Sequence, residues 1–462
     1  MTGPQPPHPL TPYAPLIVNA ALTGMVGMRD DVPRLPVTTE QIVRDAWVCH
    51  SVGASVLHLH LRDERGGPDW DPTRYGALIE AVRDRCPDAI ICASTSGRTF
   101  PEPERRGAVL GLDGPGKPDM ASLTLGSLDF RTGPSVNAPD TVRALAARMR
   151  DAGIRPELEV FGSGMAAEAD RLLAEGLLEP PLYANLMLGS HHTAPATARE
   201  LVHLVDSLPA GTVWAAAGIG AFQAPMNGLA VFMGGHVRTG LEDSTRLPPG
   251  APRERPTANS DLVGAAVDLA RRAGRAVASP AQARALLGLP HGGRAEYRIR
   301  PACLPDDREP MLRVLETANM HRVPSPEMDD FDVGSWFVAE VAGRVVGVAG
   351  YRMLRDPGGP VGKTTLLAVL PEERSKGIGR ALQSLRMELM RDAGASRVVT
   401  NADRPETIQW YQRHFGYRVV GEVEKLHEFG LPEVDRWTTL EAPLELEPPE
   451  PLEAPAPLGS PR

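Results

Sequence analysis

The stretch Val-Leu-His-Leu-His-Leu-Arg-Asp at residues 56–63 joins an apolar strand to a polar end. Alternate residues of a strand face the same side, so His58 and His60 point together and the intervening leucines point the other way. Leucines that face surrounding helices, with polar side chains toward the C-terminal end, are typical of a (β/α)8 barrel. The stretch therefore predicts both a barrel strand and the place of a site.

The same alternation runs through the first 290 residues, where short apolar segments are separated by amphipathic ones. Eight strands alternating with helices predict a closed (β/α)8 TIM barrel, with a doubly wound parallel sheet as the alternative. Polar residues gather at the C-terminal end of nearly every segment, which favours the barrel. The candidate strands are Leu16–Leu22, Val56–Leu61, Ala89–Thr95, Met120–Leu125, Pro156–Phe161, Leu182–Leu188, Thr212–Gly218 and His236–Glu242.

The sequence pattern changes after a short polar segment at residues 291–295. We therefore expect the barrel over residues 15–292 and a second domain, of the α+β class, over residues 296–444. Residues 1–14 are rich in proline, and residues 445–462 are rich in proline and glutamate. Segments of this composition do not bury a core, so both tails are predicted to be disordered.

The composition restricts the class of protein. A formal charge of −9 without a basic stripe argues against a nucleic-acid partner, and no apolar run reaches the roughly 18–20 residues that span a bilayer. The N-terminus has neither the basic nor the apolar region of a signal peptide. The four cysteines have no spacing typical of disulfides or metal sites, which predicts a cytoplasmic protein with reduced thiols.

Two imidazoles on one face at the end of a strand suit a zinc site of two histidines and one carboxylate, although two structural histidines are the alternative. The segment Gly-Gly-His-Val-Arg-Thr-Gly-Leu-Glu-Asp-Ser at residues 234–244 offers the carboxylate. In a closed barrel the eighth strand lies beside the first, which brings Glu242 within reach of His58 and His60. Alone, Glu242 and Asp243 would be interpreted as a surface pair, but the two motifs together favour zinc.

The barrel half resembles the β-keto acid cleavage enzymes, a family of zinc barrels. The matching stretches are PLIVNAALTG, ASVLHLHLRD, PDMASLTLGS, RPELEVF, WAAAGIG and GGHVRTGLEDS. In that family the site residues have three roles. The resemblance assigns these roles to His58, His60 and Glu242 as zinc ligands, to Arg238 and Asp243 as a catalytic dyad, and to Ser94 and Ser122 as hydroxyls that hold substrate.

The resemblance implies an acyl exchange between a β-keto acid and acetyl-CoA. Zinc would polarise the ketone, and Asp243, oriented by Arg238, would remove the proton from C2. The carbanion would attack acetyl-CoA, and the released CoA thiolate would cleave the chain to give acetoacetate and a new acyl-CoA. The glycine-rich turn at residues 217–225 suits the CoA phosphates, although turns also need glycine. A zinc aldolase or lyase without CoA is the alternative.

One departure from the family concerns the substrate. In the member that typifies this family, the substrate carries an ammonium group, and a glutamate at the end of the first strand holds it. Val26 stands at that position here. We therefore expect a β-keto acid with an uncharged or anionic tail, and Arg29 would be the partner of an anionic one. Glu157 and Glu159 keep an amine substrate open, with structural carboxylates as the other interpretation.

The second half resembles the GNAT acyltransferases over residues 297–440. Arg-Ser-Lys-Gly-Ile-Gly at residues 374–379 fits the loop of that family, in which backbone amides and a helix N-terminus face a pyrophosphate. The resemblance implies that Tyr411 protonates the departing CoA thiolate, with a packing role as the alternative. It also implies CoA contacts at Val369, whose amide would receive the acyl carbonyl, and at Arg374, Gly377 and Gly379.

Two features of this half leave its contacts open. Arg404 stands where many members of the family have asparagine, so the contact of that asparagine is in doubt. The acidic residues Asp329, Asp330 and Asp332 fall where acceptors often bind, and could attract a cationic amine. An exposed acidic loop is the interpretation that we favour.

The sequence as a whole predicts a bifunctional enzyme, in which a zinc-dependent barrel is fused to an N-acyltransferase. Its partners would be a β-keto acid, CoA thioesters and an amine acceptor, and the acyl-CoA made by the barrel would be the donor in the second half. A second half that only binds CoA as a regulatory module is the alternative. The resemblance of the barrel to its family also implies a homo-oligomer.

Overall fold

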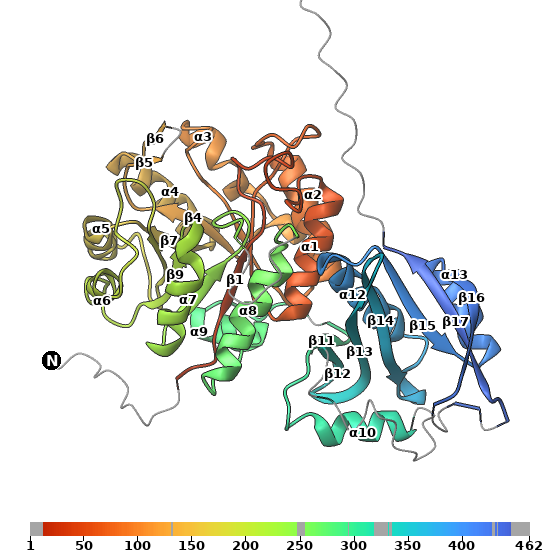
Figure 1. Cartoon of the computed structure of the whole chain (residues 1–462). Coiled ribbons are helices and arrows are strands. Elements are labelled where there is room, and N and C mark those ends of the chain that lie inside the picture. Colours follow the sequence, from red (N-terminus) through yellow and green to blue (C-terminus); the bar gives the residue numbers. More distant parts are fainter. Residues whose placement is uncertain are drawn as a thin grey trace, which may run out of the picture. The chain divides into compact units, whose positions relative to one another are not determined.

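The computed structural model describes residues 13–444 apart from 131–132, 247–254, 294, 318–330, 332–334, 427–429 and 432. The chain divides into two compact units, Met1–Pro301 and Ala302–Arg462, which Figure 1 draws as ribbons. The two predicted tails lie outside the described residues except for Tyr13 and Ala14. Both contact Arg275, which donates from Nε to the carbonyl of Ala14 over 2.8 Å.

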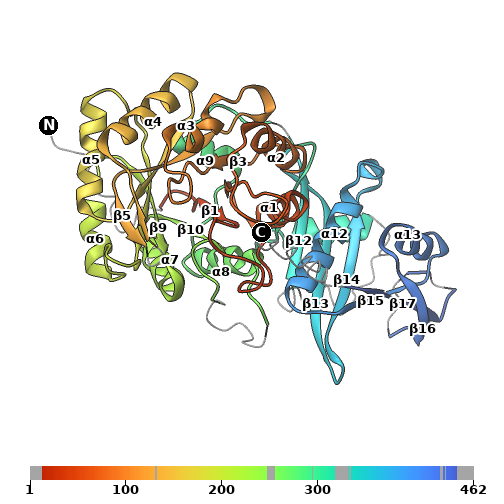
Figure 2. The same ribbon diagram turned by 90° about the horizontal axis from the view of Figure 1, so that it is seen from above.

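The first unit contains a closed barrel of eight parallel strands in the order β1-β10-β9-β8-β7-β4-β3-β2. Closure confirms the predicted TIM barrel and excludes the doubly wound sheet. In Figures 1 and 2 helices surround the central strands. The strands are β1 (Val18–Ala21), β2 (Val56–Leu59), β3 (Ile90–Ala93), β4 (Met120–Thr124), β7 (Arg155–Val160), β8 (Tyr183–Leu188), β9 (Val213–Gly218) and β10 (His236–Thr239).

Several barrel helices begin or end at residues that the sequence marks. The side chain of Thr38 accepts a hydrogen bond from the amide of Gln41 at the start of α1, and Gly153 and Gly288 end α4 and α9 in the left-handed region. A small hairpin, β5 (Leu128–Phe130) and β6 (Gly133–Ser135), follows β4. The helices are α1 (Thr39–Val52), α2 (Pro72–Arg85), α3 (Pro103–Arg106), α4 (Pro139–Ala152), α5 (Ser163–Ala174), α6 (Ala198–Asp206), α7 (Gln223–Phe232), α8 (Asn259–Arg272) and α9 (Pro280–Leu287).

The two ends of the barrel differ in polarity. At the N-terminal ends of the strands, Ile17, Val56 and Ile90 pack with Ala283 and Leu287 of α9 in one buried cluster. Burial of this apolar surface stabilises the barrel and closes this end. This apolar cluster does not extend to the C-terminal ends of the strands, where polar side chains lie.

The eighth strand is shorter than predicted. The expected strand His236–Glu242 ends at Thr239, because Gly240 has φ +152°. A Cβ atom at Gly240 would lie 2.0 Å from the carbonyl oxygen of Ala21, so only glycine lets the chain pass this close to β1. Glu242 and Asp243 therefore lie in the turn that follows the strand.

The second unit contributes β12 to β17 to a seven-stranded sheet in the order β11-β12-β13-β14-β15-β17-β16, which confirms the predicted α+β class. β14 pairs with β15 in parallel only between Val361–Lys363 and Arg397–Val399. The other elements are β11 (Arg298–Pro301), α10 (Arg308–Thr317), β12 (Ser335–Val341), β13 (Arg344–Asp356), β14 (Gly359–Val369), α12 (Ile378–Asp392), β15 (Arg397–Ala402), α13 (Pro405–Phe415), β16 (Arg418–Glu424) and β17 (Arg436–Pro443).

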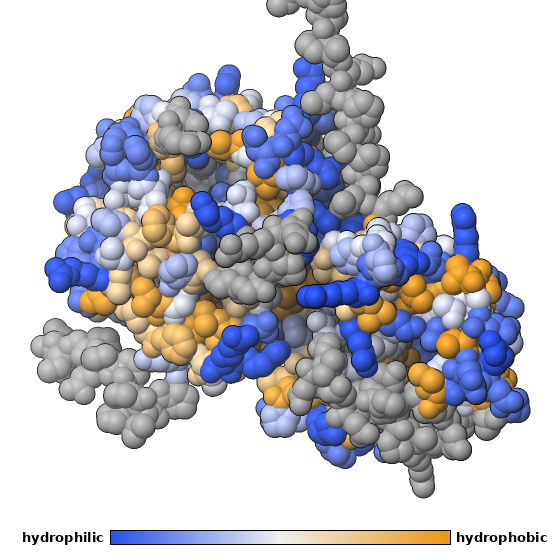
Figure 3. Space-filling model, in the orientation of Figure 1, coloured by the Kyte–Doolittle hydropathy of each residue, from blue (hydrophilic) through white to orange (hydrophobic). Residues whose placement is uncertain are grey.

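Exposed apolar side chains gather on one face of the first unit. On the face shown in Figure 3, hydrophobic side chains gather over α6 and α7, where Val202, Phe222 and Phe232 are exposed. Among the described residues, no helix has the length and apolar character that crossing a bilayer requires.

Candidate active site

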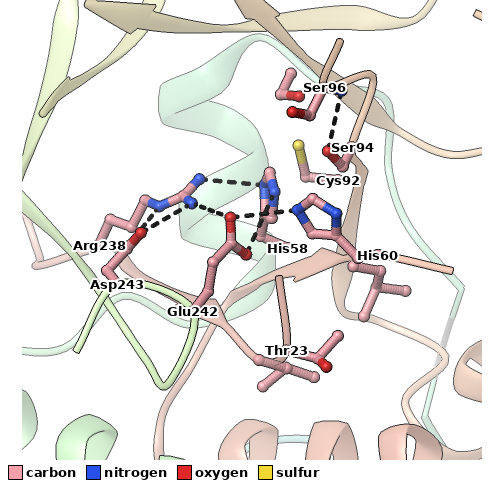
Figure 4. Close-up of polar contacts among 12 residues, drawn as sticks. Thr23, His58, His60, Cys92, Ser94, Ser96, Arg238, Glu242 and Asp243 are labelled. Atoms are coloured by element: carbon pink, nitrogen blue, oxygen red, sulfur yellow. Dashed lines mark hydrogen bonds and ion pairs between the residues drawn. The ribbon is translucent and has the colours of Figure 1, made fainter. Parts of the chain in front are cut away.

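The two histidines predicted from the sequence meet Glu242 at the C-terminal end of the barrel, as Figure 4 shows. His58 lies on β2 and His60 follows it directly, and both are buried. The Nε2 atom of His60 lies 3.2 Å from Oε1 of Glu242, and Nε2 of His58 lies 3.8 Å from Oε2. The three side chains each offer one ligand atom within 4.8 Å of the others. This group could hold a metal ion.

The backbone of β1 makes room for this arrangement. β1 lies between β2 and β10, with Ala21 opposite His58 and Asn19 opposite Arg238. Gly24, just beyond β1, has φ +58°, and a Cβ atom there would lie 2.7 Å from Cγ of Glu242. β1 therefore separates β2 from β10, and Gly24 leaves space for the side chain of Glu242 in the turn that follows β10.

Arg238 is the charged centre of the site. It is completely buried on β10. Its Nε donates to Oδ2 of Asp243 over 2.9 Å, and its Nη2 donates to Oε1 of Glu242 over 2.9 Å. Its Nη1 lies 3.5 Å from carboxylate oxygens of both Glu157 and Glu159. The predicted dyad of Arg238 and Asp243 is therefore part of a larger cluster of charges.

Glu157 contacts Nδ1 of His58, the ring nitrogen that does not face Glu242. Its Oε2 lies 2.7 Å from Nδ1 of His58, and its Oε1 accepts a hydrogen bond from the side-chain amide of Asn19 over 2.5 Å. Cys92 donates its thiol to the same carboxylate over 3.2 Å. Sequence reasoning missed this partner of His58, although the alternation of Glu157 and Glu159 along one strand already places both on one face.

Burial and charge shift the pKa values in opposite directions across the cluster. Burial raises the pKa of Asp243, and the charge of Glu242 raises it further although Arg238 lowers it. Burial also opposes the charged form of Glu157, but the adjacent His58 outweighs it and lowers the pKa of Glu157 to about 2. Asp243 is therefore the stronger base of these two carboxylates.

Glu159 faces the same cluster from the next inward position of β7. Its Oε2 accepts a hydrogen bond from the hydroxyl of Thr124 over 2.7 Å. Burial raises the pKa of Glu159, although Arg238 lowers it. Both carboxylates of this strand thus contact residues of the protein itself.

The predicted substrate residues differ in their surroundings. Ser94 follows β3 and lines a small cavity with His60. The hydroxyl of Ser122 is buried and accepts a hydrogen bond from the amide of Thr95 over 3.0 Å. Val26 is exposed, and Arg29 donates to the carbonyl of Pro33 over 3.3 Å. Neither Val26 nor Arg29 has a described contact with the histidines or Glu242.

The second unit contains a cleft of about 840 Å³ between β14 and β15. It opens because the two strands pair only near the start of each and then separate. Gly377 has φ +82° and precedes α12, so the loop turns toward the cleft. Asp329, Asp330 and Asp332 lie outside the described residues. The cleft is lined by every residue predicted to contact CoA, namely Val369, Arg374, Gly377 and Gly379, and by Tyr411 and Arg404.

Comparison with known families adds to this geometry. Residues 15–289 match the family model of the beta-keto acid cleavage enzyme, and residues 303–417 match that of the acetyltransferase (GNAT) family. Both matches confirm the resemblances that the sequence motifs indicated.

Three curated relatives match the barrel half. The chain is 36% identical over 275 residues to the 3-keto-5-aminohexanoate cleavage enzyme of Fusobacterium nucleatum, covering 59% of this chain and 98% of the relative. It is 36% identical over 279 residues to the 3-oxoadipate:acetyl-CoA acetyltransferase of Cupriavidus necator, covering 60% and 95%. It is 29% identical over 308 residues to the 3-dehydrocarnitine:acetyl-CoA trimethylamine transferase of Rhizobium meliloti, covering 61% and 99%.

The charge cluster makes a stability prediction. Arg238→Met should lower the free energy of unfolding of the barrel by about 3–5 kcal/mol, since it leaves buried carboxylates without their cation. The loss should be smaller at pH 5 than at pH 8, because carboxylates can then bind protons. Urea unfolding at both pH values measures the free energy of unfolding of each variant. The control is Arg271→Met, which removes an exposed pair with Asp268 and should change stability by less than about 1 kcal/mol. Equal losses in both variants would contradict the prediction.

Proposed function

The chain belongs to the β-keto acid cleavage enzyme family and carries a GNAT domain, and from this premise we propose that it is a bifunctional acyltransferase. Its barrel would exchange acyl groups between a β-keto acid and acetyl-CoA with the help of zinc. Its GNAT domain would transfer an acyl group from CoA to an amine. The observation that carries the first activity is the buried group of His58, His60 and Glu242 beside the pair of Arg238 and Asp243.

The free atoms of this group support zinc. Nε2 of His58 and Oε2 of Glu242 are buried and have no hydrogen-bond partner among the described residues. Two imidazole nitrogens and one carboxylate oxygen are a donor set that catalytic zinc uses. Glu157 holds the other nitrogen of His58, and such a carboxylate behind a ligating histidine is common in zinc sites.

A second group of possible ligands, formed by His58, Cys92 and Glu157, supports a metal less well. Its atoms already bond to one another, with Nδ1 of His58 and the thiol of Cys92 both on Oε2 of Glu157. A metal there would have to replace these contacts. We therefore assign zinc to the group that includes Glu242.

The proposed exchange begins with removal of a proton from C2 of the β-keto acid. Zinc, when bound, would supply a Lewis acid that polarises the ketone. Asp243 would accept the proton, because two hydrogen bonds from Arg238 hold its carboxylate and burial raises its pKa. Ser94 and Ser122 would hold the substrate by their hydroxyls.

The new carbon–carbon bond would then form between C2 and the acetyl carbon of acetyl-CoA, which releases the CoA thiolate. Attack of this thiolate on the original ketone carbon would break its bond to C2. The products would be acetoacetate and an acyl-CoA that carries the rest of the substrate. Asp243 would return its proton to C2 of the departing acetoacetate.

Two variants separate the zinc site from the base. Asp243→Asn should keep zinc and lower the rate of exchange by about 10²–10⁴-fold, the usual effect of general acid–base catalysis. Glu242→Ala removes one of three ligands, so the zinc content of the purified protein should fall as well. Mass spectrometry of the products measures the rate of exchange, and elemental analysis of the protein measures its zinc content.

Asp268→Asn, an exposed carboxylate on α8, is the matched control and should behave as wild type. Wild-type exchange by Asp243→Asn would contradict the role of the base. Cleavage by the wild-type chain without acetyl-CoA would favour an aldolase or lyase instead.

The tail of the substrate is the second part of the proposal. The names of two relatives refer to substrates with an amine, in 3-keto-5-aminohexanoate, and with a second carboxylate, in 3-oxoadipate. This chain has Val26 where the amine partner of the family stands, and Arg29 lies three positions further on. We therefore propose a β-keto acid with an uncharged or anionic tail.

For this chain, kcat/KM for 3-oxoadipate should exceed kcat/KM for 3-keto-5-aminohexanoate. Arg29→Gln should lower the former about 10-fold, because losing one contact to a charged group costs about 1.5 kcal/mol. 3-Oxohexanoate, whose tail is uncharged, is the control substrate, and its kcat/KM should not change. Steady-state kinetics with the three β-keto acids measures each kcat/KM. A higher kcat/KM for 3-keto-5-aminohexanoate than for 3-oxoadipate would overturn the proposal.

The GNAT domain is proposed to use the acyl-CoA that the barrel makes. The cleft with its glycine loop and Tyr411 supports CoA binding and an acid beside the thiolate. A domain that binds CoA only as a regulator would not need this tyrosine. Fusion in one chain supports a shared intermediate.

The purified chain, given 3-oxohexanoate, acetyl-CoA and a panel of primary amines, should form N-butyryl amides. The exchange converts this acid to butyryl-CoA, and Tyr411→Phe should let butyryl-CoA accumulate while amide formation falls. Mass spectrometry distinguishes the products. Glu242→Ala is the control, since it should form the amide only when butyryl-CoA is added.

Formation of acetyl amides alone would contradict transfer between the two activities. If no amide forms although the chain still binds CoA, a GNAT domain that binds CoA only as a regulatory module would be favoured.

We further propose a cytoplasmic homo-oligomer. The exposed apolar side chains Val202, Phe222 and Phe232 over α6 and α7 support an interface between copies of the chain. All four cysteines are free, which agrees with a reducing compartment.

A further inference from the structure

The guanidinium of Arg386 lies in an unusual environment within the GNAT domain. Arg386 of α12 is 1% exposed. Among the residues that the structure describes, no carboxylate lies within ion-pair distance of it, and its contacts are neutral oxygens. Its Nε donates to Oε1 of Gln383 over 2.6 Å, and its Nη2 donates to the hydroxyl of Tyr411 over 3.1 Å. A buried cation with this set of partners calls for an explanation.

Part of the explanation is a bulge between β13 and β14. Ala349 pairs with Leu367 and Tyr351 pairs with Thr364, so the register shifts at Gly350. The shift leaves Thr365 and Leu366 without partners in the register of β13 and β14, and Nη1 of Arg386 lies within 3.0–3.4 Å of three backbone carbonyls at this point. These carbonyls belong to Gly350, Thr365 and Leu366. Arg386 therefore contacts both strands at the bulge.

The bond to Tyr411 has a direction that chemistry fixes. A guanidinium only donates hydrogen bonds, so the Tyr411 oxygen must accept the one from Arg386. The phenolic proton is then free to point elsewhere, and Tyr411 lines the cleft. Gln383 has a fixed orientation too, because its amide nitrogen donates to the hydroxyl of Tyr417 over 3.0 Å and its oxygen faces Arg386.

We propose that Arg386 is a positioning residue for acyl transfer, which acts through Tyr411 on the CoA leaving group. The amine attacks the thioester carbon and the bond from that carbon to sulfur breaks. The Tyr411 O–H then gives its proton to the departing thiolate. The phenolate that remains lies beside the positive charge of Arg386, which stabilises it until the proton lost by the product nitrogen replaces it.

This inference rests on the acid role proposed above for Tyr411. It explains why a cation is buried without a carboxylate, since a carboxylate there would neutralise the charge that the phenolate needs. The same side chain contacts the bulge of β14 and the hydroxyl of Tyr411. Leu367, which pairs with Ala349 at the edge of that bulge, lines the cleft.

A double-mutant cycle tests the proposal on the full chain, with acetyl-CoA and butylamine as probe substrates. Tyr411→Phe and Arg386→Gln should each lower kcat for CoA release by at least about 10-fold, and KM for acetyl-CoA should change by less than about 3-fold. In the double variant the loss should match that of Tyr411→Phe alone, because the arginine acts only through the hydroxyl. Arg313→Gln, an exposed arginine of α10, is the control.

Arg386→Lys is the second variant, for the case in which Arg386→Gln does not fold. A lysine keeps a cation that only donates, so it should recover much of kcat although it cannot span the three carbonyls. Wild-type kcat in Tyr411→Phe would overturn the acid role itself. Reduced kcat in Tyr411→Phe, together with independent and multiplicative losses in the double variant, would overturn only the role of Arg386.

Discussion

The barrel site depends on one buried positive charge. Arg238 is surrounded by four carboxylates, and without it their burial in one small volume would be strongly unfavourable. The charge is shared unequally, since the closest contacts go to Glu242 and Asp243 at 2.9 Å, while Glu157 and Glu159 lie 3.5 Å away. Because Arg238 holds one oxygen of Glu242, it also fixes which oxygen remains free beside His58.

The backbone places these charges together with little help from side-chain packing. The parallel register sets β1 between the strand of His58 and the strand of Arg238. Glycines at positions 24 and 240 then let the turn after β10 fold against the end of β1. The apolar cluster at the opposite end of the barrel stabilises the strands without occupying the site. Stability and chemistry are thus assigned to opposite ends of the same strands.

Sequence periodicity predicted the barrel, the facing histidines and the sheet class of the second half, because strand alternation and loop motifs are local. Glu242 was predicted as part of a strand, but Gly240 ends that strand, and only the close approach to Ala21 makes this necessary. The contact of Glu157 with His58 was not predicted, since the two are 99 residues apart and face each other across the lumen. The surroundings of Val26 likewise depend on loop packing that no local pattern encodes.

The two sites use buried arginines in a comparable way. Each guanidinium only donates, so each partner must accept with an oxygen lone pair. For Asp243 this leaves a carboxylate held in place, with its remaining lone pairs able to take a proton. For Tyr411 it leaves the phenolic proton directed away from Arg386. Under the proposed roles, the arginine would hold a base in place where its partner is a carboxylate, and would stabilise the phenolate left by an acid where its partner is a phenol. In that proposal the partner, and not the cation, decides which way the proton moves.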